Sequence, residues 1–243
     1  MAKKNQFRRN QDHIYGYSFV APTIIGLLIL NVYPLIQTIY LSFTSAKAFG
    51  DYDFVGLGNY VTMLTSGEFW RATWNTLLFC ILTVPVGVLL ALLVAILLNS
   101  KIRGKVVFRA IFFLPMVVAP AAVAMVWKWM FNSEYGIINT MFHLDTGWIT
   151  DPKIVILTVA IVAIWSSIGY DAVLLLSGIQ NISKSYYEAA SLDGATKIQQ
   201  FFRITLPMVS PTLFVVMIMR LMASIKVYDL IYMMVGEGNP ALS

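Results

Sequence analysis

The sequence predicts an all-α polytopic membrane protein, because of its composition, its long apolar runs and the constraints that lipid places on the backbone. Hydrophobic residues make up 58% of the 243 residues and charged residues 12%, which is about half of the roughly 25% found in soluble domains. Several apolar runs reach the roughly 20 residues that a helix needs to cross a bilayer. Backbone groups in lipid must be hydrogen-bonded within their own segment, so these runs are expected to be helices.

Five runs are predicted to span the membrane. They form a single transmembrane domain, residues 1–243, and cover residues 15–43, 73–99, 108–130, 154–176 and 208–235. Pro115 and Pro120 should bend the third run or mark its beginning. In the second run, Gly87, Ala91 and Ala95 recur every four residues, a spacing that lets helix backbones approach closely in lipid.

The first run follows a basic tail, so a cleaved signal peptide is the alternative to an uncleaved first span. Its apolar stretch is about twice as long as the ~7–15 residues usual in a signal peptide, and this length favours the span. The motif Ala46-Lys47-Ala48 resembles a cleavage site and keeps the alternative open.

Positively charged residues predict the orientation of the chain. Eleven Lys and Arg residues fall in the N-terminal tail and in the two loops that share its side of the membrane, against four in the loops of the other side. Because cytoplasmic loops carry the excess of Lys and Arg, the N-terminus is expected to be cytoplasmic.

The composition also excludes several classes of function. The net charge of +5 comes without a basic, aromatic-interleaved stripe, so no nucleic-acid partner is expected. One cysteine, Cys80, and two distant histidines, His13 and His143, offer neither a disulfide nor a metal site. No nucleophile with a base is evident, so no catalytic residue is predicted. Without a GxxxxGK(S/T) phosphate loop, energy from ATP would have to come through a partner.

A polar segment between the fourth and fifth runs, residues 178–207, is predicted to be a cytoplasmic loop with two short helices. Ser185–Glu188 and Thr196–Gln199 have the spacing of N-terminal capping boxes. Gly194 supplies the left-handed conformation that ends a helix. From the residues alone, the segment fits equally well an amphipathic connector on the bilayer and a docking element for another protein.

This loop carries a resemblance to a known family. Glu188–Ala195, followed by Ile204–Pro207, resembles the EAA loop of binding-protein-dependent ABC importer permeases. The resemblance implies that the loop docks in a cleft of a separate ATPase subunit, so that closure of the ATPase dimer on ATP switches the pore from inward-facing to outward-facing. The residues implied in this coupling are Tyr187, Glu188, Ala189, Ala190, Leu192, Asp193, Gly194 and Ala195.

The chain is similar over essentially its whole length to the sugar-permease branch of that family, which includes the maltose-type and glycerol-phosphate-type importers. The matching features are Ala21-Pro22, Tyr33-Pro34, Trp165, Gly169, Tyr170, Gly178–Ile182, Tyr187 and Lys226–Asp229. The similarity implies a type I ABC importer transmembrane domain. Five spans would be present and a sixth, after the loosely matching segment Gly236–Pro240, would be missing from the C-terminus.

The resemblance also implies a function and a set of partners. The chain would be the pore-forming permease subunit of an ATP-driven importer in a bacterial or archaeal inner membrane. It would take up a carbohydrate or related solute that an extracytoplasmic binding protein delivers. Its other partners would be an ATPase subunit dimer that holds ATP and Mg²⁺, a second and distinct homologous permease, and lipid. The chain itself would bind no cofactor.

Ionisable residues inside the runs are candidates for the substrate path, since charges in lipid usually face a partner or a water-filled passage. Arg220 lies deep in the fifth run. Lys226 and Asp229 are three residues apart and could neutralise each other on one helical face. Trp165 and Tyr170 would offer flat apolar faces to a sugar. The alternative is a structural ion pair, or a lysine that extends to the interface.

An ion-gradient-driven secondary transporter is the alternative function. Such a protein would carry carboxylates near the middle of the membrane, together with inverted repeats. The carboxylates available here, Asp171 and Asp229, are expected toward the ends of their spans, and no repeat is evident. The importer is therefore the favoured hypothesis.

Overall fold

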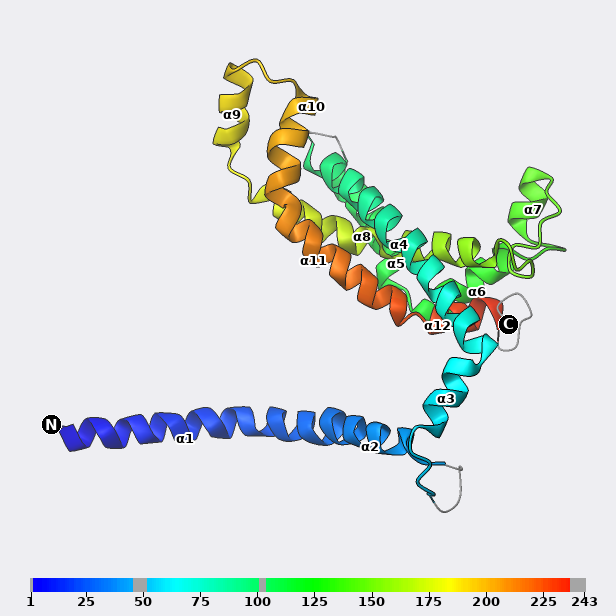
Figure 1. The fold of residues 1–243 in the computed structure, drawn as a ribbon. Helices are drawn as coiled ribbons and strands as arrows, with labels where there is room; N and C mark the ends of the chain where they lie inside the picture. Colours follow the sequence, from blue (N-terminus) through cyan, green and yellow to red (C-terminus); the bar gives the residue numbers. More distant parts are fainter. Residues whose placement is uncertain (1, 46–51, 101–103, 237–243) are drawn as a thin grey trace. The chain divides into compact units, whose positions relative to one another are not determined.

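The computed structural model describes residues 2–45, 52–100 and 104–236, and within those ranges it is nearly all helical (Figure 1). β pairing there is confined to one isolated bridge between Thr44 and Phe54. The predicted all-α class is therefore confirmed. Several predicted features lie outside the described residues: the Ala46–Ala48 motif, the basic residues Lys101 and Arg103, the segment after Gly236, and the side chains of the basic N-terminal tail.

The chain divides into two compact units, Met1–Phe69 and Trp70–Ser243. The first unit contains one long helix, made of three consecutive segments, and one short helix. Its elements are α1 (Ala2–Leu27), the π-helical segment η1 (Leu28–Val32), α2 (Tyr33–Ser42) and α3 (Gly58–Thr65). The stretch Tyr15–Ser42 is long and apolar enough to cross a membrane.

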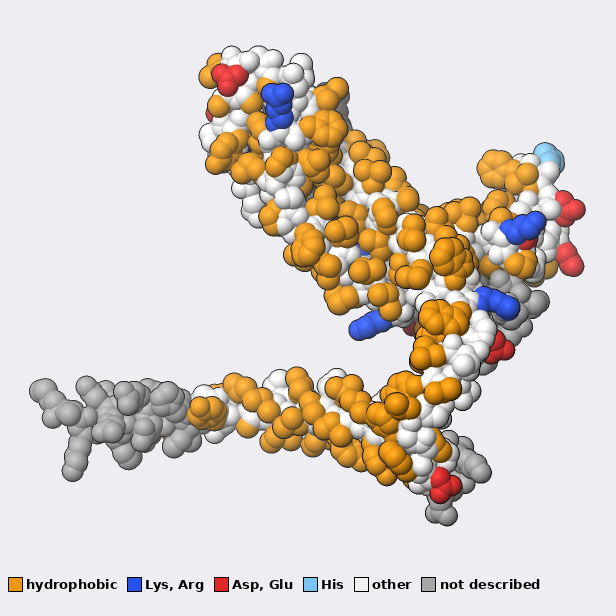
Figure 2. Space-filling model, viewed as in Figure 1, with side chains coloured by type: hydrophobic (Ala, Val, Ile, Leu, Met, Phe, Trp, Pro, Cys, Tyr) orange, Lys and Arg blue, Asp and Glu red, His pale blue; other side chains and the backbone are white. Residues whose placement is uncertain are grey.

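The second unit is a helical bundle with a helical loop. Its elements, the first of which begins just before the unit, are α4 (Gly67–Asn99), α5 (Lys105–Val117), α6 (Pro120–Met130), α7 (Ile137–Phe142), α8 (Val155–Gln180), α9 (Lys184–Leu192), α10 (Lys197–Gln200), the π-helical segment η2 (Phe201–Thr205), α11 (Leu206–Ile225) and α12 (Asp229–Val235). On the visible face, hydrophobic side chains cover α4 and α11, whereas most charged side chains gather around the α9–α10 end and around α7 (Figure 2). Such a surface suits helices surrounded by lipid.

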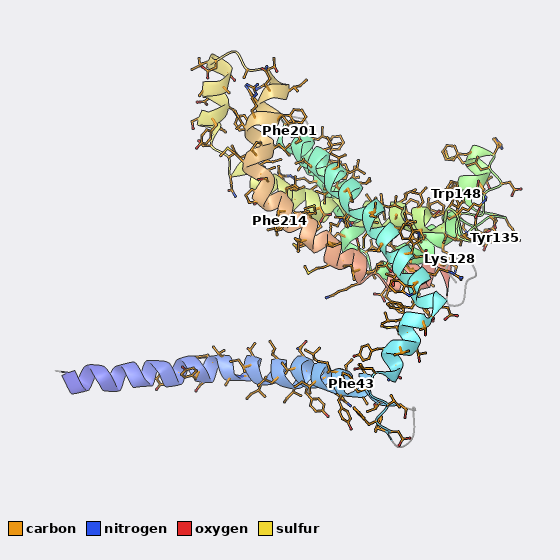
Figure 3. The ribbon with its side chains drawn as sticks, viewed as in Figure 1. Phe43, Lys128, Tyr135, Trp148, Phe201 and Phe214 are labelled. Carbon is orange, nitrogen blue, oxygen red and sulfur yellow. The ribbon has the colours of Figure 1, made fainter. Side chains whose placement is uncertain are left out.

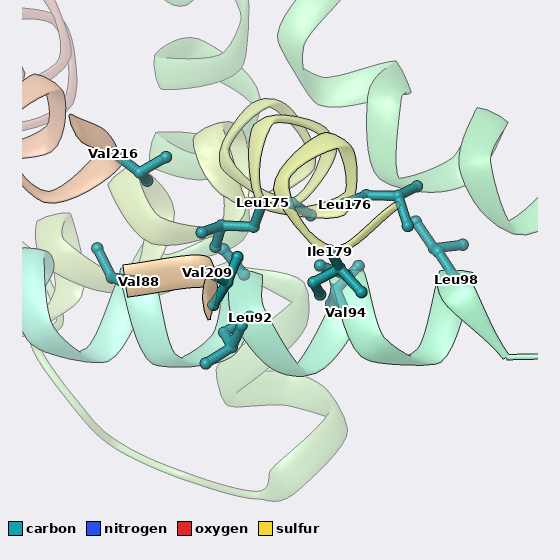
Figure 4. Packing of buried hydrophobic residues seen from close by; sticks show 12 residues of the cluster. Val88, Leu92, Val94, Leu98, Leu175, Leu176, Ile179, Val209 and Val216 are labelled. Carbon is teal, nitrogen blue, oxygen red and sulfur yellow. The ribbon is translucent and has the colours of Figure 1, made fainter. Parts of the chain in front are cut away.

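One hydrophobic core of this unit lies where α4, α8 and α11 pack together (Figure 4), and a second lies where α4, α6, α8 and α12 meet. The first is built of small and branched aliphatic side chains: Val88, Ala91, Leu92, Val94, Ala95, Leu98, Ala172, Leu175, Leu176, Ile179, Val209 and Val216. Ala91 and Ala95 are fully buried, so the predicted small-residue face of α4 lies in the core. The close backbone approaches are instead those of α8 with α5 and with α11. Gly178 of α8 contributes to the second of these, because a Cβ there would meet Thr212 Oγ1 of α11 at 2.7 Å.

The third predicted span, residues 108–130, is not one helix but two. α5 and α6 are bent by 98° at the two residues between them. Val118 and Ala119 have ψ of 137° and 133°. At Ala119 the cause is the ring of Pro120, which disfavours the helical conformation in the residue before it. The expected bend is therefore confirmed at Pro120, whereas α5 continues through Pro115.

The fifth predicted span, residues 208–235, is not one continuous helix. α11 stops at Ile225, and a short non-helical stretch separates it from α12. In the other direction the helix extends back through η2 and α10 to Lys197. α12 packs instead against α6 and α8. Its buried side chains are Leu230, Met234 and Val235. This tertiary burial stabilises the break, and hydropathy along the chain cannot show it.

The segment around α7, where Figure 3 labels Tyr135 and Trp148, is held by one buried amide and by aromatic contacts. Asn139 Nδ2 donates to the carbonyls of Ser133 and Thr146, and Asn139 Oδ1 accepts from Trp148 Nε1 at 2.6 Å. The Trp148 and Phe131 rings lie with their centroids 5.5 Å apart. These contacts anchor the loop between α6 and α8 to the end of α6.

Gly169 of α8 is the basis of a stability prediction. A Cβ at Gly169 would collide with the carbonyl oxygen of Phe112 in α5. Gly169→Ala should therefore destabilise the fold by about 1–3 kcal/mol and lower the midpoint of thermal unfolding in detergent. The single cysteine, Cys80, is buried, so a dye that fluoresces on reaction with a thiol reports unfolding. Gly67→Ala, where an added Cβ has no neighbour within 4 Å, is the control. Equal midpoints for the two variants would contradict the close packing of α5 and α8.

Candidate functional site

The segment between α8 and α11 forms a small two-helix projection at one end of the second unit (Figure 1). We name residues 183–200, which comprise α9, the corner and α10, the knuckle. Ser183 caps α9: its backbone is extended, with ψ of 136°, and its Oγ accepts a long hydrogen bond of 3.4 Å from Ser185 N. The predicted capping box of Ser185 and Glu188 is therefore wrong, because α9 begins before Ser185 and is capped two residues earlier.

The corner of the knuckle has the predicted geometry. Thr196 Oγ1 accepts a hydrogen bond from Gln199 N at 3.3 Å, and Gln199 Oε1 accepts one from Thr196 N at 2.8 Å. Gly194 has φ of +76°, a left-handed conformation that is unfavourable for residues with a Cβ. The second capping box and the glycine corner are therefore confirmed.

One residue that holds the knuckle together is absent from the predicted site. Gln200 is 4% exposed. Its Nε2 donates to Ser191 Oγ at 2.9 Å and to the Ala195 carbonyl at 3.2 Å, and its Oε1 accepts from Lys197 Nζ at 3.3 Å. One side chain thus joins the end of α9, the corner and α10. The capping-box spacing identifies Gln199, which is exposed, but because glutamine is usually exposed, no signal in the sequence indicates that Gln200 is buried.

The predicted coupling residues all lie on the knuckle, but they differ in exposure. Tyr187 is half-buried, and its OH shares a hydrogen bond of 2.9 Å with Thr205 Oγ1 of η2. Ala190 and Ala195 are also half-buried. The exposed members are Glu188, Ala189, Leu192, Asp193 and Gly194.

The exposed side of the knuckle offers both charge and apolar surface. Leu192 is 90% exposed and Ile198 is 72% exposed. Within the described part of the chain, Glu188 has no ion-pair partner. This side of the knuckle therefore presents a carboxylate without an ion-pair partner in the described chain, next to exposed aliphatic side chains.

A cavity of about 380 Å³ lies between the α5–α6 bend, α8 and α11. Its wall is mostly apolar, with a few polar groups: Ser166, Ser167, Tyr170, Arg220 and Ser224. Such a mixture is typical of sites for small ligands. Of the predicted path residues, the cavity brings Tyr170 and Arg220 together. Trp165 lines a separate cavity of about 400 Å³ between α4, α5 and α8, and Lys226 and Asp229 line neither of the two.

Arg220 forms an ion pair inside the bundle. Its Nε lies 2.7 Å from Asp171 Oδ2, and the two residues are 6% and 3% exposed. The sequence predicts Asp171 toward the end of its span. Since α8 continues to Gln180, this residue instead lies well inside the helix. The expected pair of Lys226 and Asp229 is also wrong: Lys226 follows the end of α11 and Asp229 begins α12, so they share no helical face.

The Arg220 guanidinium also lies against α4. A Cβ at Gly87 would meet Arg220 Nη2 at 2.5 Å and Cζ at 3.1 Å, so a glycine at this position makes room for the side chain. One turn away on each helix, Thr83 Oγ1 and Ser224 Oγ share a hydrogen bond of 2.8 Å. α4, α8 and α11 therefore meet in polar contacts within an otherwise apolar core.

Comparison with known proteins places the chain in a family. Residues 54–243 match the profile of the binding-protein-dependent transport system inner membrane components. The chain belongs to this family. Its members are the non-catalytic membrane components of ABC transporters, in which the ATPase is a separate subunit.

Relatives and solved structures agree with this assignment. The permease is 33% identical to a probable ABC transporter permease protein of Bacillus subtilis, YesP, over 99% of this chain and 79% of the relative. It is 32% identical to the trehalose/maltose transport system permease protein MalF of Thermococcus litoralis, over 92% of this chain and 77% of the relative. A bacterial ABC transporter involved in the import of the acidic polysaccharide alginate matches with a TM-score of 0.85 at 25% identity, covering 98% of this chain and 82% of that one. The expected family and fold are thereby confirmed, and the permease is a multi-pass membrane protein.

Gln200 is the basis of a prediction about the knuckle. Gln200→Ala removes the two hydrogen bonds that its Nε2 donates, each contributing about 0.5–1.5 kcal/mol. The backbone amides of residues 191–200 should then exchange with solvent faster, as measured by hydrogen–deuterium exchange of the purified permease. Ile198→Ala, at an exposed position of α10, is the control and should leave exchange unchanged. Wild-type protection in Gln200→Ala would show that this side chain does not hold the knuckle.

Proposed function

We propose that this permease forms one half of the passage of an ATP-driven importer for a carbohydrate or related solute, and that a homologous but distinct permease forms the other half. One observation carries the proposal. The exposed knuckle continues directly into α8 and α11, and these helices place Tyr170 and Arg220 at the cavity. The surface that would receive mechanical work and the space that would hold solute are therefore built on the same two helices.

The names of the relatives support a carbohydrate as the solute. They include a sulfoquinovosyl glycerol permease, SmoG, of Agrobacterium fabrum and a lactose permease, LacF, of Rhizobium radiobacter, at 32% and 31% identity. A second solved structure, at TM-score 0.83 and 26% identity, is an alginate ABC transporter in complex with a pentasaccharide-bound periplasmic protein. A binding protein outside the membrane would deliver the solute here too.

The knuckle would take its power stroke from an ATPase dimer that holds ATP and Mg²⁺. Glu188 would pair with a basic residue of the ATPase, since its carboxylate is exposed and free of partners within the described chain. The small side chains of Ala189 and Ala190 would let the ATPase surface approach, and Gly194 would form the corner. The knuckle and the N-terminus would face the cytoplasm, in a bacterial or archaeal inner membrane.

The solute would pass through the cavity beside α8 and α11. Tyr170 offers an aromatic face and Arg220 a hydrogen-bond donor at its wall, groups that suit a sugar ring and its hydroxyls. Trp165 would belong to the path only if the neighbouring cavity joins it during transport. Roles for Lys226 and Asp229 stay predictions without support from either cavity.

Reconstituted transport tests the proposal. In liposomes that contain the permease, its partner permease and the ATPase, with binding protein on the outside, solute uptake should require ATP. Glu188→Ala should lower uptake about tenfold or more, because truncating one member of an interfacial charge pair typically costs about 2–5 kcal/mol. Glu134→Ala, the same change at an exposed position outside the knuckle, should leave uptake unchanged. Uptake that persists without nucleotide would favour the gradient-driven alternative.

Thiol labelling tests the orientation. In a Cys80→Ala background, Met141→Cys near α7 and Leu192→Cys on the knuckle place a thiol at sites that are 71% and 90% exposed. A membrane-impermeant maleimide added to intact cells should label Met141→Cys at once, and should label Leu192→Cys only after the membrane is permeabilised. The reverse pattern would place the knuckle outside and exclude its docking to an ATPase.

A further inference from the structure

In the described part of the chain, the two helices that carry the knuckle are joined in their interior by one contact between opposite charges. α8 leads into the knuckle, and α11 follows it through α10 and η2. Their interface is otherwise made of aliphatic contacts, and such contacts are non-directional, so they hold two helices together without setting how far one has slid along the other. The Arg220–Asp171 pair differs, because Nε lies 2.7 Å from Oδ2. Neither atom has a hydrogen-bond partner among the described residues, so the contact is one of opposite charges. Its attraction falls as the charges separate, and it therefore favours one position.

We infer that Arg220 and Asp171 are positioning residues that make α8 and α11 move as one body, so that a displacement of the knuckle reaches the wall of the cavity. The inference rests on the proposed function. Beside the donor that Arg220 would offer to the solute, it assigns to the pair a second role, the transmission of movement between two sites of the same chain.

The surroundings of the pair offer neither charge another place to go, since a buried charge has no water around it. Both side chains are more than nine-tenths buried, and an isolated charge at such a place is strongly unfavourable. A slide of one helical turn would shift the two side chains by about 5.4 Å relative to each other and separate the charges. The guanidinium is also enclosed by α4, since Gly87 leaves just enough room for it. The pair is therefore strongly favoured at one register of α8 against α11.

The same pair determines the polar wall of the cavity. Arg220 itself lines the cavity, and Tyr170, the residue before Asp171, lines it from α8. Ser224, one turn after Arg220, lines it from α11 and is hydrogen-bonded to Thr83 of α4. Holding Arg220 on Asp171 thus fixes the positions of the polar groups on both helices, and a joint movement of α8 and α11 would carry these groups together.

The decisive variant removes both charges at once. Asp171→Leu combined with Arg220→Met leaves no isolated charge, and replacing a buried ion pair by apolar residues of similar size often leaves stability unchanged. The assembled complex should still hydrolyse ATP within about twofold of the wild-type rate, while solute taken up per ATP falls about tenfold or more, in the range of typical coupling between sites. A double variant with wild-type uptake per ATP would overturn the inference.

A matched control separates this effect from a general loss of charge. Glu68→Gln with Arg71→Met removes one anion and one cation from exposed positions at the start of α4, outside the knuckle and the cavity, and should keep uptake per ATP at the wild-type value. The single variant Arg220→Lys keeps a cation opposite Asp171, and its solute uptake per ATP should lie between that of the wild type and that of the double charge variant. An equal loss in the control would show that the effect does not belong to the buried pair.

A distance measurement makes the test independent of the proposed function. Spin labels at Ile161 of α8 and Val215 of α11, which are 45% and 54% exposed, report the relative position of the two helices by pulsed electron resonance. The distance distribution should be narrow in the wild type and broadened in the double charge variant. If the wild type shows no ATP-dependent uptake, the proposed function fails. If the distribution stays narrow in the double variant, the inference about the pair fails.

Discussion

Lipid offers the backbone no hydrogen-bond partner, and this constraint explains where the helices of the permease are interrupted. Non-helical backbone at membrane depth is tolerated where it is buried in protein or borders a cavity. The break between α5 and α6 contains Val118, and the break between α11 and α12 contains Val227. Both residues line the cavity that also holds Tyr170 and Arg220. The interruptions and the cavity are therefore two aspects of one arrangement, in which the backbone departs from the helix where the chain itself provides the surroundings.

Local patterns could be predicted from the sequence, and contacts between distant segments could not. The charge-free second run, residues 73–99, predicts the residue at which α4 ends. The spacing of Thr196 and Gln199 predicts a capping box that forms as expected. The break before α12 depends on burial against α6 and α8, which no local pattern records. The Arg220–Asp171 pair joins the fifth apolar run to the fourth. Opposite charges in two such runs are a signal for it, but spacing along the chain predicts a different pair, Lys226 with Asp229.

Helical phase explains why the predicted path residues separate in space. Trp165 and Tyr170 are five residues apart on α8, which places them about 140° apart around the helix axis. They consequently line different cavities. The same reasoning applies to Gln199 and Gln200, about 100° apart, of which one caps α10 and the other is buried against α9. Residue type and proximity in sequence identified the right region in both cases, but the facing of each side chain depends on the packing of the helix that carries it.

The π-helical segment η2 sets how the side chains of α10 are rotated relative to those of α11. A π turn holds one more residue than the α turn it replaces, so every side chain on α10 is rotated relative to α11 by the equivalent of one extra position, about 100°. Gln200 faces Ser191 in this rotated frame. Shortening residues 201–205 by one would regularise the helix yet turn Gln200 away from α9. The number of residues in this short stretch is thus as constrained as their chemistry. It sets the rotation of the α10 side chains about the helix axis relative to those of α11.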